Sequence, residues 1–470
     1  MSLGAATAAD VVVVGSGVAG LAAAVEAEAA GLRVAVLEAR AEIGGASGIS
    51  VGGCCIVDTP LQEAAGIADS VELAAGDWRR AGGPQAEMVW ARSYLRDSRG
   101  FVYDWCRALG VEWVDLRLFD GNSVPRWHLP RDGGPGVMAA LLARLERAGV
   151  DPIREAKVTS IKGAEGGGLE LESTAGPWRA GAVIMATGGF AASAEMLLRH
   201  RPSLGELPRF LCGGDESAVG SGHALLAELG ASFRGLDRVW IYPVGTPSHR
   251  LPPPRGLVVR GVDAEIWLNA EGVRFHDETR RGGASGTPAL MRQPGATAWG
   301  IFDADTASGL LLLDDRELGT PLRTDPRRAE EFWESAPFAW RARTLGELAE
   351  RSGLPPDRVE GSVARFNELV ERGRDDDFGR PPDTLRPIVR PPFHAIRYLP
   401  LAQKTFGGAR TGPDCQVVDA PRGIFAAGEL TGMAGGGING VGALEGTMFG
   451  PCIYSGRLAG IAASRFVAAT

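Results

Sequence analysis

The chain has 470 residues, of which 45% are hydrophobic and 23% charged, and its formal net charge is −8. This composition is typical of a folded globular protein, and the length predicts two or more domains. The acidic balance, with no long basic run, argues against nucleic acid as a partner, and no apolar run reaches the roughly 18 residues of a membrane-spanning helix.

The first forty residues predict a strand, a glycine-rich turn, a helix and a second strand. The apolar run 10–14 leads into G-x-G-x-x-G at 15–20, a helix begins at 21–25, and the strand 32–37 ends on Glu38. This order is that of the dinucleotide-binding βαβ unit, whose acidic ribose contact follows the glycines by about twenty residues. The unit predicts a nucleotide site and does not distinguish FAD from NAD.

Each glycine of the turn has an expected role. Gly15 permits the tight turn, Gly17 lets the backbone approach a pyrophosphate, and Gly20 lets the helix pack closely on the strand. The helix N-terminus presents N–H groups to the phosphates, and Glu38 can accept hydrogen bonds from ribose hydroxyls. Because the strand begins within ten residues of the N-terminus and leaves no room for a signal peptide, we expect a cytoplasmic protein.

Two later segments also bring backbone toward a nucleotide. Gly44-Gly-Ala-Ser47 is a turn of small residues, and the buried strand that starts at 181 ends in Ala186-Thr-Gly-Gly189. Between them, residues 60–150 are mostly helical in pattern, and the segments 156–161 and 168–173 alternate as antiparallel strands do.

The composition of the sequence changes near residue 226, and the earlier composition returns near residue 395. Residues 242–256 are rich in proline, glycine and arginine, and residues 344–374 predict two helices separated by a proline pair. Short strands, turns, a glycine-rich loop and an apolar helix then follow. We therefore expect one domain from 1–225 and 395–470, with a second domain inserted at 226–394.

The motifs together resemble the FAD enzymes of the fumarate reductase and succinate dehydrogenase flavoprotein superfamily. Besides those above, they include Phe406-Gly-Gly and Ala426-Ala-Gly-Glu429. The resemblance covers the chain in order and is nearest the branch of 3-ketosteroid dehydrogenases and tricarballylate dehydrogenase. It implies an α/β fold, with a Rossmann-like FAD-binding domain of the glutathione reductase type and an inserted α+β cap domain.

The resemblance also implies the cofactor and the residues that hold it. Noncovalent FAD is expected because no histidine stands where covalent members carry theirs, although a thioether to Cys54 or Cys55 is an alternative. Glu429 would meet the ribityl chain, and the backbone of Ala443 and Leu444 would meet the pyrimidine edge of the ring. The expected FAD-binding residues are Gly15, Ser16, Gly17, Val18, Ala19, Gly20, Glu38, Ala39, Arg40, Gly44, Gly45, Ala46, Ser47, Val158, Ala186, Thr187, Gly188, Gly189, Gly428, Glu429, Ala443 and Leu444.

The family's reaction, as the resemblance implies it, moves two electrons at a CH–CH bond next to a carbonyl or carboxyl group. One carbon exchanges hydride with flavin N5, and its neighbour exchanges a proton with a side chain. A small carbonyl or carboxylate substrate is therefore expected. No second G-x-G-x-x-G unit is present, so electrons are expected to pass to or from an external partner. The six cysteines form no C-x-x-C pair, and no metal site is expected.

The chain departs from the family at its acid and anion contacts. Two arginines that clamp carboxylates in fumarate reductases are absent from the matching stretches, as is the loop tyrosine of ketosteroid dehydrogenases. Lys404 stands where a substrate-binding histidine is expected, and a partly buried lysine can act as acid, base or anion contact. The candidate catalytic residues are Lys404, Glu278, Arg281, Tyr242 and Asn439.

Each candidate has a structural alternative. Lys404 could be a surface or structural lysine, Glu278 and Arg281 a salt bridge of the inserted domain, Tyr242 core packing, and Asn439 a loop clasp. The leading interpretation is a desaturase or ene-reductase. A flavin oxidase or monooxygenase and an electron-transfer subunit without its own substrate remain alternatives.

Overall fold

The computed structural model describes residues 6–119, 121–164, 166–313 and 325–470. The chain divides into two compact units, the first up to Arg201 with Asp215–Trp240 and Lys404–Thr470, and the second Pro202–Gly214 with Ile241–Gln403. The main part of the second unit, Ile241–Gln403, thus begins and ends later than the expected insertion at 226–394, and the unit also includes the earlier segment Pro202–Gly214.

The first unit is built on a six-stranded sheet in the order β2-β1-β8-β7-β6, with β19 beside β8. Strands β1, β2, β8 and β19 pair parallel with one another, whereas β7 pairs antiparallel with both β6 and β8, as the alternating sequence predicts. The sheet strands are β1 (Thr7–Val14), β2 (Val34–Leu37), β6 (Val158–Gly163), β7 (Leu169–Ser173), β8 (Trp178–Met185) and β19 (Ile424–Ala426).

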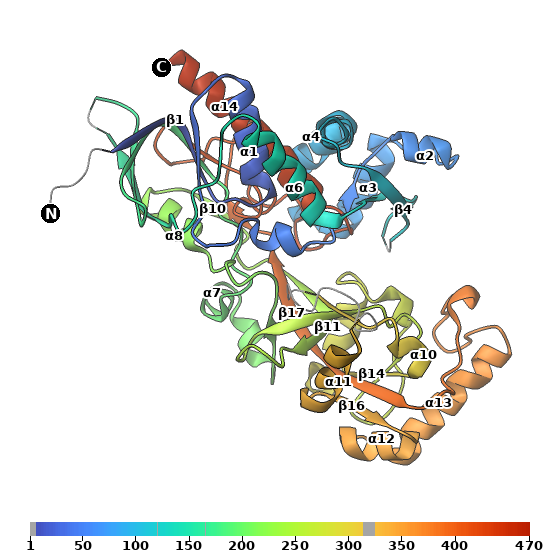
Figure 1. The fold of residues 1–470 in the computed structure, drawn as a ribbon. Coiled ribbons are helices and arrows are strands. Elements are labelled where there is room, and N and C mark those ends of the chain that lie inside the picture. Colours follow the sequence, from blue (N-terminus) through green and yellow to red (C-terminus); the bar gives the residue numbers. More distant parts are fainter. Residues whose placement is uncertain (1–5, 120, 165, 314–324) are drawn as a thin grey trace. The chain divides into compact units, whose positions relative to one another are not determined.

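Most helices of the first unit form two groups in Figure 1, one packed around the N-terminal helix Val18–Ala29 and one from residues 60–108. The helices are α1 (Val18–Ala29), α2 (Pro60–Ala64), α3 (Val71–Gly82), α4 (Met88–Ser98), α5 (Trp105–Ala108), α6 (Gly133–Glu146), α7 (Ala194–His200), α8 (Ser221–Glu228) and α14 (Phe449–Ala469). The remaining strands are β3 (Cys54–Cys55), β4 (Trp113–Arg117), β5 (Trp127–Pro130), β10 (Phe233–Arg234) and β18 (Gly408–Ala409). Strands β4 and β5 of the small sheet β3-β5-β4 lie within the stretch 60–150 that was predicted to be mostly helical.

Helices α1 and α14, from opposite ends of the chain, pack side by side (Figure 1). A Cβ at Gly456 would lie 2.2 Å from the Ala19 carbonyl oxygen, and one at Gly460 would lie 2.4 Å from that of Ala23. Any larger residue at these two positions would push the helices apart, because the contact is with backbone. The glycines of α14 therefore fix the C-terminal helix against the nucleotide-binding unit.

The second unit contains an eight-stranded sheet in the order β13-β14-β17-β11-β12-β15, with β16 and β9 both beside β17. Its strands are β9 (Leu211–Cys212), β11 (Val239–Pro247), β12 (Gly256–Arg260), β13 (Ile266–Leu268), β14 (Ala298–Phe302), β15 (Leu311–Leu313), β16 (Ala339–Ala342) and β17 (Phe393–Thr405). Its helices are α9 (Gly286–Met291), α10 (Ala304–Ala307), α11 (Pro326–Ser335), α12 (Leu345–Ser352) and α13 (Pro356–Glu371).

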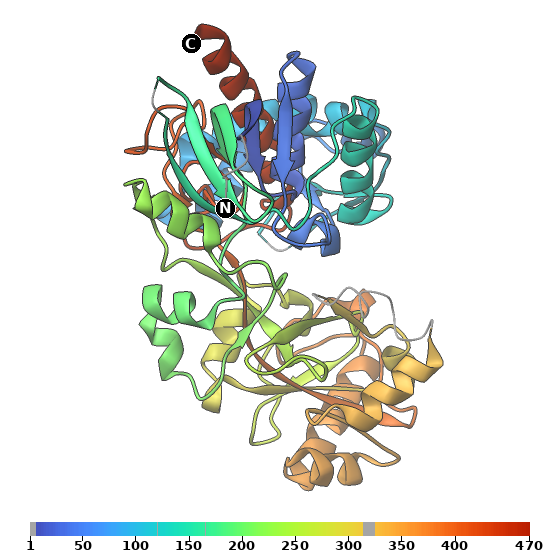
Figure 2. The same cartoon turned by 60° about the vertical axis from the view of Figure 1, so that its left-hand side comes forward.

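The two helices predicted at 344–374 are confirmed as α12 and α13, which pack as the orange pair in Figure 2. Their apolar faces bury Leu348, Val363 and Phe366 against Ile266 and Ile301 of the sheet. A core of this kind stabilises the second unit mainly through burial of apolar surface.

The first unit contains a buried imidazole, the side chain of His128. His128 has no exposed surface; its Nδ1 lies 2.9 Å from the Arg126 carbonyl oxygen and its Nε2 2.7 Å from Thr59 Oγ1. The carbonyl can only accept, so Nδ1 carries the proton and Nε2 accepts from the threonine hydroxyl. Burial lowers the pKa of His128 from 6.5 to about 4.

We predict that this histidine makes the fold acid-sensitive. A group whose pKa is depressed on folding binds more protons in the unfolded chain, so its contribution is present above pH 6.5 and is lost as the pH falls toward 4. His128→Gln should therefore cost stability at pH 7, and that cost should shrink by about 2 kcal/mol at pH 5. Urea unfolding of both proteins at the two pH values measures this, and a pH-independent difference would contradict it.

Candidate functional site

One cavity of the first unit lies at the carboxyl ends of the four parallel strands. Gly15 follows β1, Glu38 follows β2, Ala186 follows β8, and Gly428 lies two residues after β19. Ligands of open parallel sheets bind at this edge. The space between its walls, open mouth included, is about 970 Å³.

The lining includes most of the residues expected to hold FAD. They are Gly15, Ser16, Gly17, Val18, Ala19, Glu38, Ala39, Gly44, Gly45, Ala46, Ser47, Val158, Ala186, Thr187, Gly188, Gly189, Gly428 and Glu429. Of the other four, Gly20 lies inside α1, Arg40 extends toward Asp215, and Ala443 and Leu444 are buried in the loop before α14.

The glycine turn has the geometry that its sequence predicts. Gly15 has φ = +107°, and a Cβ there would lie 2.4 Å from the Ala186 carbonyl oxygen, while one at Gly20 would lie 2.0 Å from the Gly15 carbonyl oxygen. Gly17 differs, because the nearest atom to its Cβ position is Ser47 Oγ at 3.6 Å. The protein itself leaves room for a side chain at Gly17, so this glycine keeps space open on the cavity side.

The Glu38 carboxylate, which follows β2, is hydrogen-bonded to the glycine turn at 15–20. Glu38 Oε2 accepts from the backbone N–H of Ser16 at 3.1 Å and from its hydroxyl at 2.5 Å, and Oε1 accepts from the Arg40 N–H at 3.0 Å. The Gly44 N–H donates to Ser16 Oγ at 3.1 Å. Ser47 Oγ accepts from the Val18 N–H at the start of α1, at 3.0 Å. Three separate loops are thus held together on one wall of the cavity.

A second carboxyl group lies at another part of the lining. Glu429 Oε1 accepts from the Thr405 N–H at 2.8 Å and from its hydroxyl at 3.1 Å. Burial raises the pKa of Glu429, while the Thr405 hydrogen bond and the positive charge of Lys404 act against that rise. Lys404 is partly buried and lies close enough to Glu429 to interact with its charge.

The cavity also has lining residues that the sequence analysis missed: Val14, Leu37, Ala156, Lys157, Ser217, Ala218, Ser221, Leu225 and Cys452. Four of them come from the segment 215–225, whose acids and glycines do not form a dinucleotide-binding motif. A signal was nevertheless available, because this segment follows the Ala186–Gly189 turn and carries small residues at 217, 218 and 221.

One hydroxyl in this wall has no partner in the protein. Thr187 Oγ1 is buried and makes no hydrogen bond with any described residue. Such a group costs free energy unless something bonds to it. Together with the open space at Gly17, it indicates a wall shaped for a bound molecule with polar atoms, and a dinucleotide such as FAD fits this wall.

In the second unit, Glu278 belongs to a buried cluster of charges. Its carboxylate accepts from Arg274 Nε and Nη2, each at 2.8 Å, from Arg380 Nη1 at 3.2 Å and from the Trp267 N–H at 3.0 Å. Arg274 also donates to Asp375 at 2.8 Å. A carboxylate with four donors has little capacity left for a substrate, which supports the structural alternative for Glu278.

Arg281 pairs with other acids than Glu278. Its Nη2 donates to Glu265 at 2.8 Å and its Nη1 to Asp263 at 3.1 Å. Glu265 is fully buried and also accepts from the Tyr398 hydroxyl at 2.5 Å and from Trp267 Nε1 at 2.8 Å. Burial raises the pKa of Glu265, and the charge of Arg281 opposes the rise.

The last two catalytic candidates are buried. The Arg260 guanidinium lies 4.8 Å from the ring centre of Tyr242. Asn439 has no exposed surface and donates through Nδ2 to the Thr447 carbonyl oxygen at 3.0 Å. The Asn439 Oδ1 atom makes no hydrogen bond with any described residue. Asn439 therefore clasps the loop 439–447 and retains one unused acceptor.

Three other possibilities gain no support. Cys54 and Cys55 are buried in β3 and are absent from the cavity lining, and burial raises the pKa of the Cys55 thiol to about 12. No cluster of three potential metal-ligating side chains occurs in the part of the chain that the structure describes. No helix among the described residues is long and apolar enough to cross a membrane.

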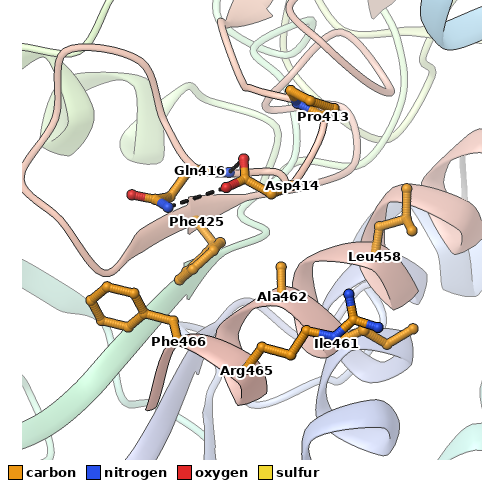
Figure 3. A pocket seen from close by; sticks show the side chains of 9 residues that line it. All are labelled: Pro413, Asp414, Gln416, Phe425, Leu458, Ile461, Ala462, Arg465 and Phe466. Atoms are coloured by element: carbon orange, nitrogen blue, oxygen red, sulfur yellow. Dashed lines mark hydrogen bonds between the residues drawn. The ribbon is translucent and has the colours of Figure 1, made fainter. Parts of the chain in front are cut away.

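A second hollow of the first unit lies beside α14 (Figure 3). It is lined by Pro413, Asp414, Gln416, Phe425, Leu458, Ile461, Ala462, Arg465 and Phe466. The Gln416 side chain donates to Asp414 at 3.2 Å across its rim. Its walls are mostly apolar, and none of the predicted site residues lines it. We therefore assign the cofactor site to the other cavity, at the carboxyl ends of the parallel strands, which we call the strand-end cavity.

Comparison with known proteins agrees with this geometry. The family model for an FAD binding domain matches residues 10–448. The chain is 30% identical to a KsdD-like steroid dehydrogenase of Mycobacterium tuberculosis, over 96% of this chain and 95% of the relative. It is also 30% identical to an NADH:fumarate oxidoreductase of Klebsiella pneumoniae, over 97% of this chain but only 48% of that relative's length.

Among solved structures, the open conformation of a flavocytochrome c3 fumarate reductase is similar, with a TM-score of 0.77 and 26% identity. That similarity covers 99% of this chain and 79% of the other. The predicted α/β flavoprotein fold and the predicted cofactor, FAD, are thereby confirmed. The chain belongs to the FAD-binding-domain family, and it is an FAD-dependent oxidoreductase of the class that contains these dehydrogenases and reductases.

Proposed function

We propose that this chain desaturates or reduces a CH–CH bond next to a carbonyl or carboxyl group of a small molecule. The single observation that supports this most is the strand-end cavity, which brings the glycine turn, Glu38 and the Glu429–Thr405 pair to one lining. The names of two relatives include steroid and fumarate, and fumarate carries a carboxyl group on each carbon of its double bond.

The residues of the cavity have distinct tasks in this proposal. The N-terminus of α1, with the turn 15–20, receives the pyrophosphate, and Glu38 faces the adjoining ribose. Glu429, held by Thr405, contacts the ribityl chain. Bound FAD supplies the two-electron step, and the protein supplies position and electrostatics. Electrons reach or leave the site through an external donor or acceptor.

Among the candidate proton-transfer and substrate-binding groups, we favour Lys404. The Glu278 carboxylate is already paired with Arg274 and Arg380, and the Asn439 side-chain N–H already donates to the Thr447 carbonyl oxygen. Lys404 carries a positive charge beside the Glu429 carboxylate, which lines the cavity. A cation there can orient the substrate's carbonyl or carboxylate oxygen and stabilise negative charge that develops on it.

Gly17→Ala tests the cofactor site. The added methyl group meets only ordinary contacts in the protein, so the flavin-free variant should keep its melting temperature, while FAD affinity should fall at least tenfold. Gly361→Ala, in α13 with no atom within 4 Å of the added carbon, is the matched control. Fluorescence titration of the flavin-free proteins measures the affinity, and unchanged FAD binding by Gly17→Ala would oppose the assigned pyrophosphate site.

An anaerobic visible spectrum tests the reaction. We expect one saturated ketone, steroid or carboxylate to bleach the oxidised flavin band, or one enone or unsaturated acid to restore it after photoreduction. Reoxidation by oxygen that outpaces every organic acceptor would favour an oxidase. A flavin band that responds to no compound would favour an electron-transfer subunit.

Lys404→Met tests the proposed substrate contact. Loss of the cation should lower kcat/KM for the responding substrate by about a hundredfold or more, since one well-placed charged contact contributes several kcal/mol to the transition state. The flavin spectrum should be retained. Lys404→Arg, which keeps the charge, should recover part of the rate, and full activity of Lys404→Met would exclude the role.

A further inference from the structure

We propose that residues 215–225 form a strap along the FAD cavity, and that the Arg40–Asp215 ion pair is the latch that holds this strap and sets how long FAD stays bound. The inference rests on the proposed placement of FAD in this cavity. It gives Arg40 a role different from the direct cofactor contact that the family resemblance implies.

The strap forms part of the cavity wall. Ser217, Ala218, Ser221 and Leu225 line the cavity together with the Gly44–Ser47 turn. A Cβ at Gly45 would lie 3.5 Å from Ser217 Oγ, so the strap and the turn approach each other closely. A molecule in the cavity is therefore retained by a wall that comes from two separate segments of the first unit.

Asp215 organises the start of the strap. Its Oδ1 accepts from the Ser217 N–H at 2.9 Å and from the Ser217 hydroxyl, and its carbonyl oxygen accepts from the Ala218 N–H at 3.0 Å. The Asp215 side chain is only 5% exposed. A buried carboxylate needs a nearby positive charge to offset its loss of hydration.

Arg40, which lies in the segment after β2, supplies that charge. Its Nη1 lies 3.3 Å from Asp215 Oδ1, and its own backbone N–H donates to Glu38 at 3.0 Å. Arg40 is absent from the cavity lining, so it acts through Asp215 rather than by touching the cofactor. Both Arg40 and Asp215 are thus positioning residues.

The far end of the strap, residues 221–225, is the first part of α8 and is anchored by Leu225 in the apolar core of the unit, whereas residues 215–220 are held mainly by hydrogen bonds. The Gly220 N–H donates to the Gly189 carbonyl oxygen at 3.1 Å, and the Ala192 N–H to that of Ala218 at 2.9 Å. These bonds join the strap to the turn after β8, whereas the latch joins it to the segment after β2. Loss of the latch therefore frees one side of the strap and leaves the fold of the unit intact.

The test is the rate at which the intact holoenzyme releases FAD, measured as the rise of flavin fluorescence after dilution. Arg40→Met should speed release about tenfold, a moderate effect because the Arg40 side chain is 32% exposed. The release rate of Arg40→Lys should lie between those of Arg40→Met and the wild type. Arg33→Met, which breaks the exposed Arg33–Asp10 pair of the same unit, is the matched control and should leave release unchanged.

A double variant separates the latch from a direct contact. Asp215→Asn should also speed release, and Arg40→Met should add almost nothing in the Asp215→Asn background. Equal release by Arg40→Met and wild type, the same acceleration by Arg33→Met, or multiplicative effects of Arg40→Met and Asp215→Asn would each overturn the latch. Absence of a flavin band from the wild-type protein would instead refute the cofactor placement on which the latch rests.

Discussion

The hydrogen bonds between Glu38 and Ser16 are the constraint on which the nucleotide site depends. The carboxylate is nearly buried, so its charge has to be stabilised by N–H and O–H donors, and the glycine turn provides them. This requirement fixes the turn after β1 against the end of β2. Since Ser16 also accepts from Gly44, the same bonds position the turn 44–47, and with it the opposite edge of the cavity.

The second unit buries several charged side chains that pair with one another. Its core contains Arg274, Arg380, Glu278 and Asp375, and each charge has an opposite partner within 3.2 Å. Removal of one member would leave an uncompensated buried charge, which is far more costly than loss of an exposed ion pair. These groups are consequently committed to holding segments that are distant in sequence, and this commitment limits their use in proton transfer.

The extent to which the sequence predicts this molecule differs between its parts. The βαβ unit is predictable because its strands, glycines and acid are local in sequence and each has one physical role. The pairing of Glu278 with Arg380 cannot be predicted from the sequence, because Arg380 lies 102 residues away and many other arginines could have paired with this carboxylate. The β3-β5-β4 sheet was missed because a two-residue strand at Cys54–Cys55 has no periodicity to detect. The strap 215–225 gains its role only from the fold, which places Asp215 beside Arg40.

The packing of α14 on α1 has a consequence for biosynthesis. Strand β1 and helix α1 are synthesised before their partners β8, β19 and α14, which lie far along the chain. The face of α1 that carries Ala19 and Ala23 therefore lacks its final cover until α14 is made. Such long-range closure is slow and leaves adhesive surface exposed. The cofactor cavity, whose lining includes Cys452 of α14, can accordingly be complete only once α14 has been made.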